Sequence, residues 1–109
     1  MRESDRQLGL RFKERLQELL GPRLLRVRAF GSRARDLCRV DSDFDLLVVV
    51  DSADYETRRS IAHLGADLML EADEPVALSP LVMDPPRIER LRQLERRLIL
   101  DIDREGVEL

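Results

Sequence analysis

Cysteine, histidine and lysine each occur only once in this chain of 109 residues, and tryptophan is missing altogether. The single Cys38 excludes an internal disulfide and a metal site built from several cysteines. No uninterrupted apolar run approaches the roughly 18–20 residues that a membrane span requires. The first ten residues, MRESDRQLGL, are charged and lack the apolar stretch of a signal peptide. These absences favour a soluble, cytoplasmic protein without a membrane partner.

A large excess of positive charge is also missing. The chain has 19 basic and 22 acidic residues, and its formal net charge is −3. Nucleic-acid-binding domains usually combine a clustered basic excess with aromatic side chains, yet aromatic residues make up only 4% of this chain. Nucleic acid is therefore not the expected partner. Every basic residue except Lys13 is arginine, which suits phosphate binding, although codon bias in a GC-rich genome explains the same preference.

The remaining composition is that of a folded domain. Hydrophobic residues make up 43% of the chain and charged residues 38%, so the chain can bury a core and wholesale disorder is excluded. No internal repeat, low-complexity tract or linker interrupts it. We therefore expect residues 1–109 to form one domain.

Apolar periodicity predicts three long helices. The first covers residues 5–20, with Ser4 or Asp5 as its cap, and the second covers residues 53–72. The third begins at the Pro85-Pro86 pair and continues to Gly106. Its apolar residues recur at spacings of three and four: Ile88, Leu91, Leu94, Leu98 and Ile102.

Strand patterns lie between these helices. Residues 24–30 alternate, whereas residues 43–50 are apolar at both parities after an acidic start, which is typical of a central strand covered on both faces. Residues 76–83 are a third strand, and Pro80 within them favours an edge position or a bulge. A short helix is expected from Ser32 to about Leu37, and residues 107–109 are a tail or a last strand. Alternating strands and helices predict a layered α/β domain.

Asp43 and Asp45 are the first candidates for chemistry. Residues two apart on a strand point to the same face, so these carboxylates repel each other unless a cation lies between them. Mg²⁺ fits, because it takes oxygen ligands from one or two carboxylates together with substrate phosphates. An EF-hand loop beginning at Asp41 is excluded, because its sixth position is Leu46 and its twelfth is Ser52. The alternative is a solvated strand start.

A second motif, Phe30-Gly31-Ser32-Arg33, directly follows the first expected strand. Glycine lets the backbone turn tightly and approach a ligand closely, and a following helix start presents free N–H groups to an anion. Ser32 adds a hydroxyl, and Arg33 and Arg35 add positive charge. The motif suits a polyphosphate, although it matches neither the P-loop nor GxGxxG. On its own, a Gly-Ser pair is more typical of an ordinary strand-to-helix turn.

The two motifs together are far more specific. GSRAR occupies residues 31–35, and SDFDLLVV follows at residues 42–49, so that ten residues separate Ser32 from Asp43. This pattern resembles the nucleotidyltransferase superfamily typified by DNA polymerase β, and in particular its small stand-alone members, the minimal nucleotidyltransferases. The resemblance covers essentially the whole chain. It implies a small mixed β-sheet flanked by helices, like the nucleotidyltransferase palm of polymerase β.

The resemblance also implies an activity and its residues. An Mg²⁺-dependent enzyme of this kind transfers a nucleotide, here AMP from ATP, to a hydroxyl of a partner molecule and releases pyrophosphate. Two Mg²⁺ ions would be held by the catalytic carboxylates of Asp43 and Asp45. The nucleotide-binding residues implied by the match are Gly31, Ser32, Arg33 and Ser42.

Minimal nucleotidyltransferases often pair with a small helical protein of the HEPN class. In such pairs the transferase is the antitoxin and adds AMP to a tyrosine of the toxin. The resemblance therefore implies two partners for this chain, a nucleoside triphosphate and a HEPN-type protein, and an oligomeric assembly is compatible with it.

The family's third carboxylate has no clear counterpart. It normally comes from a later strand, where the matching position in this chain is Ala77 or Ser79. Four acids flank that strand without being in register: Glu71, Asp73, Glu74 and Asp84. Asp36 also stands where the family often has glycine. The alternative function is therefore a catalytically degenerate module of the same fold, which binds nucleotide or a partner protein without chemistry.

Overall fold

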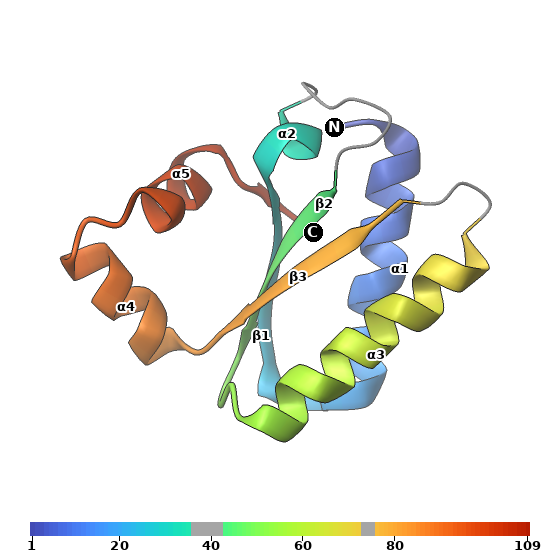
Figure 1. The fold of residues 1–109 in the computed structure, drawn as a ribbon, viewed down its shortest axis with the longest axis horizontal. Helices are drawn as coiled ribbons and strands as arrows, with labels where there is room; N and C mark the ends of the chain where they lie inside the picture. Colours follow the sequence, from blue (N-terminus) through green and yellow to red (C-terminus); the bar gives the residue numbers. More distant parts are fainter. Residues whose placement is uncertain (36–42, 73–75) are drawn as a thin grey trace.

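Four strands form one mixed sheet at the centre of the fold (Figure 1). The computed structural model describes residues 1–35, 43–72 and 76–109. Its elements are α1 (Glu3–Leu20), a 3-10 turn η1 (Gly21–Arg23), β1 (Leu24–Phe30), α2 (Gly31–Ala34), β2 (Phe44–Val50), α3 (Tyr55–Glu71), β3 (Leu78–Met83), α4 (Pro85–Gln93), α5 (Arg97–Glu105) and β4 (Val107–Glu108). The expected α/β fold with a mixed sheet flanked by helices is confirmed.

The strand order is β3-β2-β1-β4. Strand β1 is antiparallel to both β2 and β4, whereas β2 and β3 run parallel and are joined through α3. Pro80 lies on β3 at the edge of the sheet, as its missing N–H group requires. The register places Asp45 of β2 between Phe30 on one side and Ser79 on the other.

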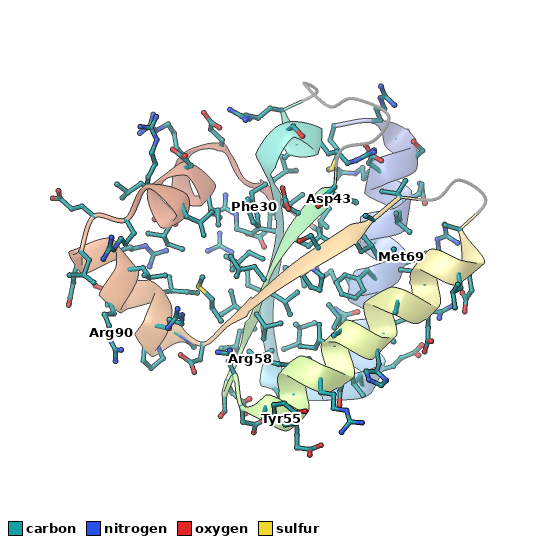
Figure 2. The ribbon with its side chains drawn as sticks, viewed as in Figure 1. Phe30, Asp43, Tyr55, Arg58, Met69 and Arg90 are labelled. Carbon is teal, nitrogen blue, oxygen red and sulfur yellow. The ribbon has the colours of Figure 1, made fainter. Side chains whose placement is uncertain are left out.

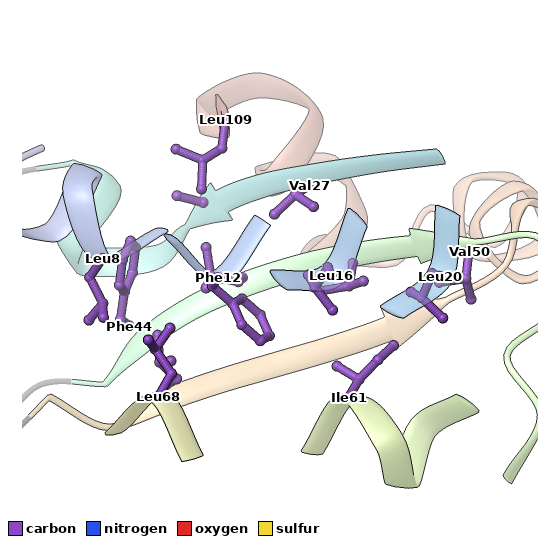
Figure 3. Packing of buried hydrophobic residues seen from close by; sticks show 14 of the residues in the cluster. Leu8, Phe12, Leu16, Leu20, Val27, Phe44, Val50, Ile61, Leu68 and Leu109 are labelled. Atoms are coloured by element: carbon purple, nitrogen blue, oxygen red, sulfur yellow. The ribbon is translucent and has the colours of Figure 1, made fainter. Parts of the chain in front are cut away.

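Strand β2 is buried on both faces, which explains why its sequence is apolar at both parities. Helices α1 and α3 cover one face and enclose the larger core, which Figure 3 shows from close by. Helices α4 and α5 lie on the opposite face over a smaller cluster (Figure 1). That cluster consists of Leu47, Val49, Met83, Ile88, Ile99 and Ile102.

The N-termini of two helices are fixed by aspartate caps. The Asp54 side chain accepts a hydrogen bond from the Thr57 amide, and Asp84 accepts one from the Arg87 amide. Helix α1 begins earlier than expected, with Arg2 at its N-cap position and no side-chain cap, so neither Ser4 nor Asp5 caps it. No helix among the described residues has both the length and the apolar character needed to cross a membrane.

The third long helix expected from the sequence is wrong, because two shorter helices replace it. Helix α4 ends at Gln93 and α5 begins at Arg97, and between them Glu95 adopts a left-handed conformation with φ of 53°. The turn lets Ile88 and Ile99 pack on the same face of the sheet. Leu94 and Leu98, which continue the apolar spacing across the break, are exposed.

Candidate active site

The two sequence motifs meet where β1 ends and β2 begins. Gly31 turns the chain with φ of +77°, a conformation that favours glycine. A Cβ atom added at Gly31 would lie 2.5 Å from Oδ2 of Asp45. The strand register explains this contact, because Asp45 lies opposite Phe30, the residue before the turn. The absence of a side chain at Gly31 therefore leaves the backbone directly against the Asp45 carboxylate.

Asp43 and Asp45 lie at the same end of the sheet, where β2 begins. Figure 2 shows Asp43 close to Phe30 beneath α2, with Tyr55 at the opposite end of the molecule. Asp45 is half-buried within β2, whereas Asp43 immediately precedes the strand and is exposed. Burial raises the pKa of the Asp45 carboxyl, and the negative charge of Asp43 raises this pKa further. Both effects disfavour a charged Asp45 unless a cation shares the site.

Ser32 stands in the first turn of α2 and is half-buried next to Gly31. Helix α2 is a single turn of four residues, and the end of the short helix expected from Ser32 to about Leu37 lies outside the described residues. Arg35 follows α2, is exposed, and pairs with Glu105 of α5 at 3.3 Å. The turn is thereby joined to the C-terminal end of α5.

Arg33 lies in a buried ion pair, and its role in binding nucleotide stays a prediction. The Arg33 side chain is only 4% exposed, and its Nη1 donates a hydrogen bond of 2.8 Å to Oδ1 of Asp5, which is equally buried. In this position the guanidinium attaches α2 to α1. Ser42, the other nucleotide-binding candidate of the second motif, lies outside the described residues.

Both positions considered for the third carboxylate lie beside the aspartate pair. Ser79 is the register neighbour of Asp45, and the Ala77 carbonyl accepts a hydrogen bond of 2.8 Å from the Phe44 amide. By the same parallel register, Ala77 lies next to Asp43. Among the described residues, no cluster of three or more His, Cys, Asp or Glu side chains is placed to hold a metal ion.

The flanking acids that the structure describes are engaged elsewhere. Glu71, at the end of α3, pairs with Arg15 of α1. Asp84 caps α4 at the opposite end of β3 from Ser79 and also accepts a hydrogen bond from the Ala53 amide. Asp73 and Glu74 lie outside the described residues. The neighbouring strand therefore brings a hydroxyl and a methyl group, rather than an acid, to the pair.

Sequence reasoning missed Asp5 as a partner of the turn motif. A signal was present, because Asp5 lies in phase with Leu8, Phe12 and Leu16 on the buried stripe of α1. A carboxylate on an apolar helix face requires a buried cationic partner, and Arg33 provides one. The sequence alone does not identify which of the 18 arginines that partner is.

A hollow of about 700 Å³ lies on the other side of the molecule, between α1 and α3. Its lining residues are Arg11, Glu14, Arg15, Glu18, Leu19 and Leu64. These residues belong to the layer that covers the sheet face opposite to Asp45. The lining contains an ion-paired Arg15, and the hollow is separate from the site at the start of β2.

Comparisons with known proteins agree with the fold. The family model described as nucleotidyltransferase domain matches residues 10–103. Among solved structures, a toxin-antitoxin crystal structure with AMP-PNP is 22% identical, with a TM-score of 0.55, covering 90% of this chain and 69% of that chain. A putative nucleotidyltransferase from Sulfolobus solfataricus is 19% identical, with a TM-score of 0.51, covering 99% of this chain and 87% of that chain. At these identities the likeness concerns the fold. No curated protein matches.

Proposed function

The chain belongs to the nucleotidyltransferase domain family, and from this premise we propose that it transfers AMP from ATP to a hydroxyl group of a partner molecule. One observation carries the proposal: the Gly31 backbone lies against the Asp45 carboxylate, next to a second carboxylate at Asp43. The backbone that we propose to bind phosphate and the carboxylates that we propose to bind metal therefore lie together at one end of the two central strands. This arrangement suits a triphosphate bound with a divalent cation.

The donor set fits Mg²⁺. Asp43 and Asp45 offer only oxygen ligands, and the raised pKa of Asp45 indicates a carboxyl whose charge is not balanced by the protein. Two Mg²⁺ ions bound by these carboxylates would neutralise charge that develops on the phosphates. Gly31 and Ser32 would hold the β- and γ-phosphates and orient the α-phosphate. The acceptor oxygen then bonds to the α-phosphorus, pyrophosphate leaves, and the hydroxyl proton passes to solvent.

The acceptor is proposed to belong to a protein partner. The solved toxin-antitoxin structure with AMP-PNP shares this fold, which supports a nucleotide-dependent role beside a second protein. We extend this to a HEPN-type helical partner, with the present chain as the antitoxin and a tyrosine hydroxyl as the acceptor. The pair would act in the cytoplasm, and residues 1–109 would supply the transferase domain.

Position-specific labelling of ATP tests the reaction class. The purified chain is incubated with its co-purifying partner, Mg²⁺ and ATP labelled at either the α- or the γ-phosphate. Nucleotide transfer is expected to give stable protein label from the α position only, because pyrophosphate carries the γ-phosphate away. The mass of the labelled band identifies the acceptor.

An Asp43→Asn variant is the control for this assay and is expected to leave the band unlabelled. Label from the γ position only would mean phosphoryl transfer and would contradict the proposal. Equal α-label with the variant would show that the transfer does not use the aspartate pair.

A second candidate function is favoured by the residues beside the pair. Ala77 and Ser79 bring no acid to the place where the family has its third carboxylate. A degenerate module would bind nucleotide, or cover a partner protein, without chemistry. Nucleotide binding that depends on Mg²⁺, with no label from either position, would favour this alternative.

Replacing Ala77 with Asp distinguishes an impaired transferase from a degenerate module. If the register from Phe44 and Leu78 continues by one residue, the new carboxylate lies beside Asp43, where it would complete a three-acid set that binds metal and accepts the hydroxyl proton. General-base assistance contributes roughly 10²–10⁴-fold, so a gain in transfer of at least about tenfold is expected. Initial rates with α-labelled ATP measure it. Unchanged transfer with normal nucleotide binding would exclude a missing acid as the limitation, and Ala77→Asn controls for the change in shape.

A further inference from the structure

We infer that Asp5 is a positioning residue of the nucleotide site, an inference that rests on the proposed function. Its buried ion pair with Arg33 attaches the single-turn helix α2 to α1. Helix α2 in turn carries Gly31 and Ser32 against Asp45. Asp5 touches neither nucleotide nor metal in this arrangement and acts only through Arg33.

The contact has little freedom to adjust. Asp5 and Arg33 are each only 3% exposed, and their hydrogen bond measures 2.8 Å. The guanidinium is planar and presents its donors in a fixed fork, so the ion pair restrains the Arg33 side chain and the helical turn that carries it. Gly31 is two residues from Arg33 in the same helical turn. A shift of α2 therefore changes the separation between the Gly31 backbone and the Asp45 carboxylate.

The pair is also poorly explained as a source of stability. Removing two charges from water is costly, and a buried ion pair often contributes less than apolar residues of the same size would. Within the described part of the chain, the second carboxylate oxygen of Asp5, Oδ2, is buried and accepts no hydrogen bond. Buried ionic groups that are not optimal for stability can instead specify one arrangement of the backbone. That arrangement here is the orientation of α2.

The same end of α1 supports the other half of the site. A Cβ atom added at Gly9 would lie 3.4 Å from Cζ of Phe44, which shows how closely α1 approaches the start of β2. Phe44 is fully buried and lies between Asp43 and Asp45 in the chain. One turn of α1 thus contacts α2 through Asp5, and the next contacts β2 through Gly9. Helix α1 therefore contacts both halves of the nucleotide site, and α2 is joined in addition to α5 through Arg35 and Glu105.

The test separates nucleotide affinity from stability. Asp5→Asn keeps the shape of the side chain and removes its charge, while Leu16→Ala removes core packing from a distant turn of the same helix. Both variants are expected to lower Tm. Only Asp5→Asn is expected to weaken the binding of Mg²⁺ and AMP-PNP, by at least about tenfold in Kd, because only it removes the charge that holds the Arg33 guanidinium and so loosens the attachment of α2 to α1. Calorimetric titration well below both Tm values measures the affinities.

Affinity within about twofold of the unaltered protein for Asp5→Asn, with a lowered Tm, would overturn the inference and leave Asp5 a structural residue. If Asp5→Asn does not fold, Arg33→Lys replaces it under the same criterion, because lysine keeps the charge but loses the fork. Failure of the unaltered protein to bind Mg²⁺ and AMP-PNP would instead contradict the proposed function. The two failures are therefore distinguishable.

Discussion

Asp45→Asn is expected to lower nucleotide transfer by about 10³-fold while raising the Tm of the metal-free protein by about 2–4 °C. The loss of transfer follows because asparagine offers a neutral amide where a charged metal ligand is required. The gain in Tm follows because the Asp45 carboxylate is half-buried, lies against the Gly31 backbone and is repelled by Asp43. One substitution is thus expected to change activity and stability in opposite directions.

The pH dependence of this gain is also determined by the pKa of Asp45. Burial and the charge of Asp43 raise that pKa in the folded protein. The contribution of Asp45 to stability is therefore fully present below the ordinary aspartate pKa of about 3.9 and is lost as the pH rises through the raised, folded-state value. The advantage of Asp45→Asn in Tm should accordingly be largest near neutral pH and disappear in acid.

Thermal unfolding at several pH values, together with the α-label assay, measures both effects. Asp101→Asn is the matched control, because Asp101 is a half-buried aspartate on α5 whose contact with Arg97 is 3.8 Å. It should leave transfer unchanged. Retention of transfer by Asp45→Asn would show that the reaction does not need this carboxylate as a metal ligand. A lower Tm at neutral pH would show that the charge of Asp45 does not destabilise the metal-free protein.

Gly31→Ala is expected to weaken Mg²⁺-dependent nucleotide binding by at least about 100-fold and to destabilise the fold. Two causes combine at this residue. Its φ of +77° strains any residue with a Cβ atom by about 1–2 kcal/mol, and the new Cβ would lie 2.5 Å from Oδ2 of Asp45. Relief of that overlap requires movement of the carboxylate or of α2. Either movement separates the two halves of the site.

Gly21→Ala isolates the first of these causes. Gly21 also has a positive φ, +55°, but nothing lies within 4 Å of an added Cβ atom. This variant should lose stability through backbone strain and keep its affinity for nucleotide. Comparison of the two alanine variants by titration and thermal unfolding therefore separates strain from the contact with Asp45. Similar affinities for both would contradict the close approach of Gly31 to the site.

Much of the fold was predictable because the hydrophobic pattern is local. The alternation in residues 24–30 and the apolar run after Asp43 predicted β1 and β2, and Pro80 predicted an edge strand; all three predictions are confirmed. The break between α4 and α5 was not predictable in this way. Neither Gly nor Pro marks it, and Leu94 and Leu98 continue the helical spacing into positions that the structure leaves exposed.

The candidate site shows the same contrast between a contact that the sequence indicates and a contact that it does not. The contact between Gly31 and Asp45 follows from neighbouring strands of known register, so the two motifs sufficed to indicate that they would meet. The ion pair of Arg33 depends on which acid it reaches across the fold, and the turn motif alone did not indicate it. Its partner Asp5 is 28 residues away in the chain. Sequence spacing contains no information about such a pair.

The mixed sheet also has a consequence for the order of folding. Antiparallel pairing of β1 with β2 joins segments that are close in the chain. Parallel pairing of β2 with β3 joins strands that are further apart, because the connection between them contains the whole of α3. Loop-closure entropy rises with the length of the connection, so the first pairing is the less costly to nucleate. The contact between Gly31 and Asp45 then belongs to the early, low-contact-order part of the chain. Residues 77 and 79 reach the aspartates only when the longer connection closes.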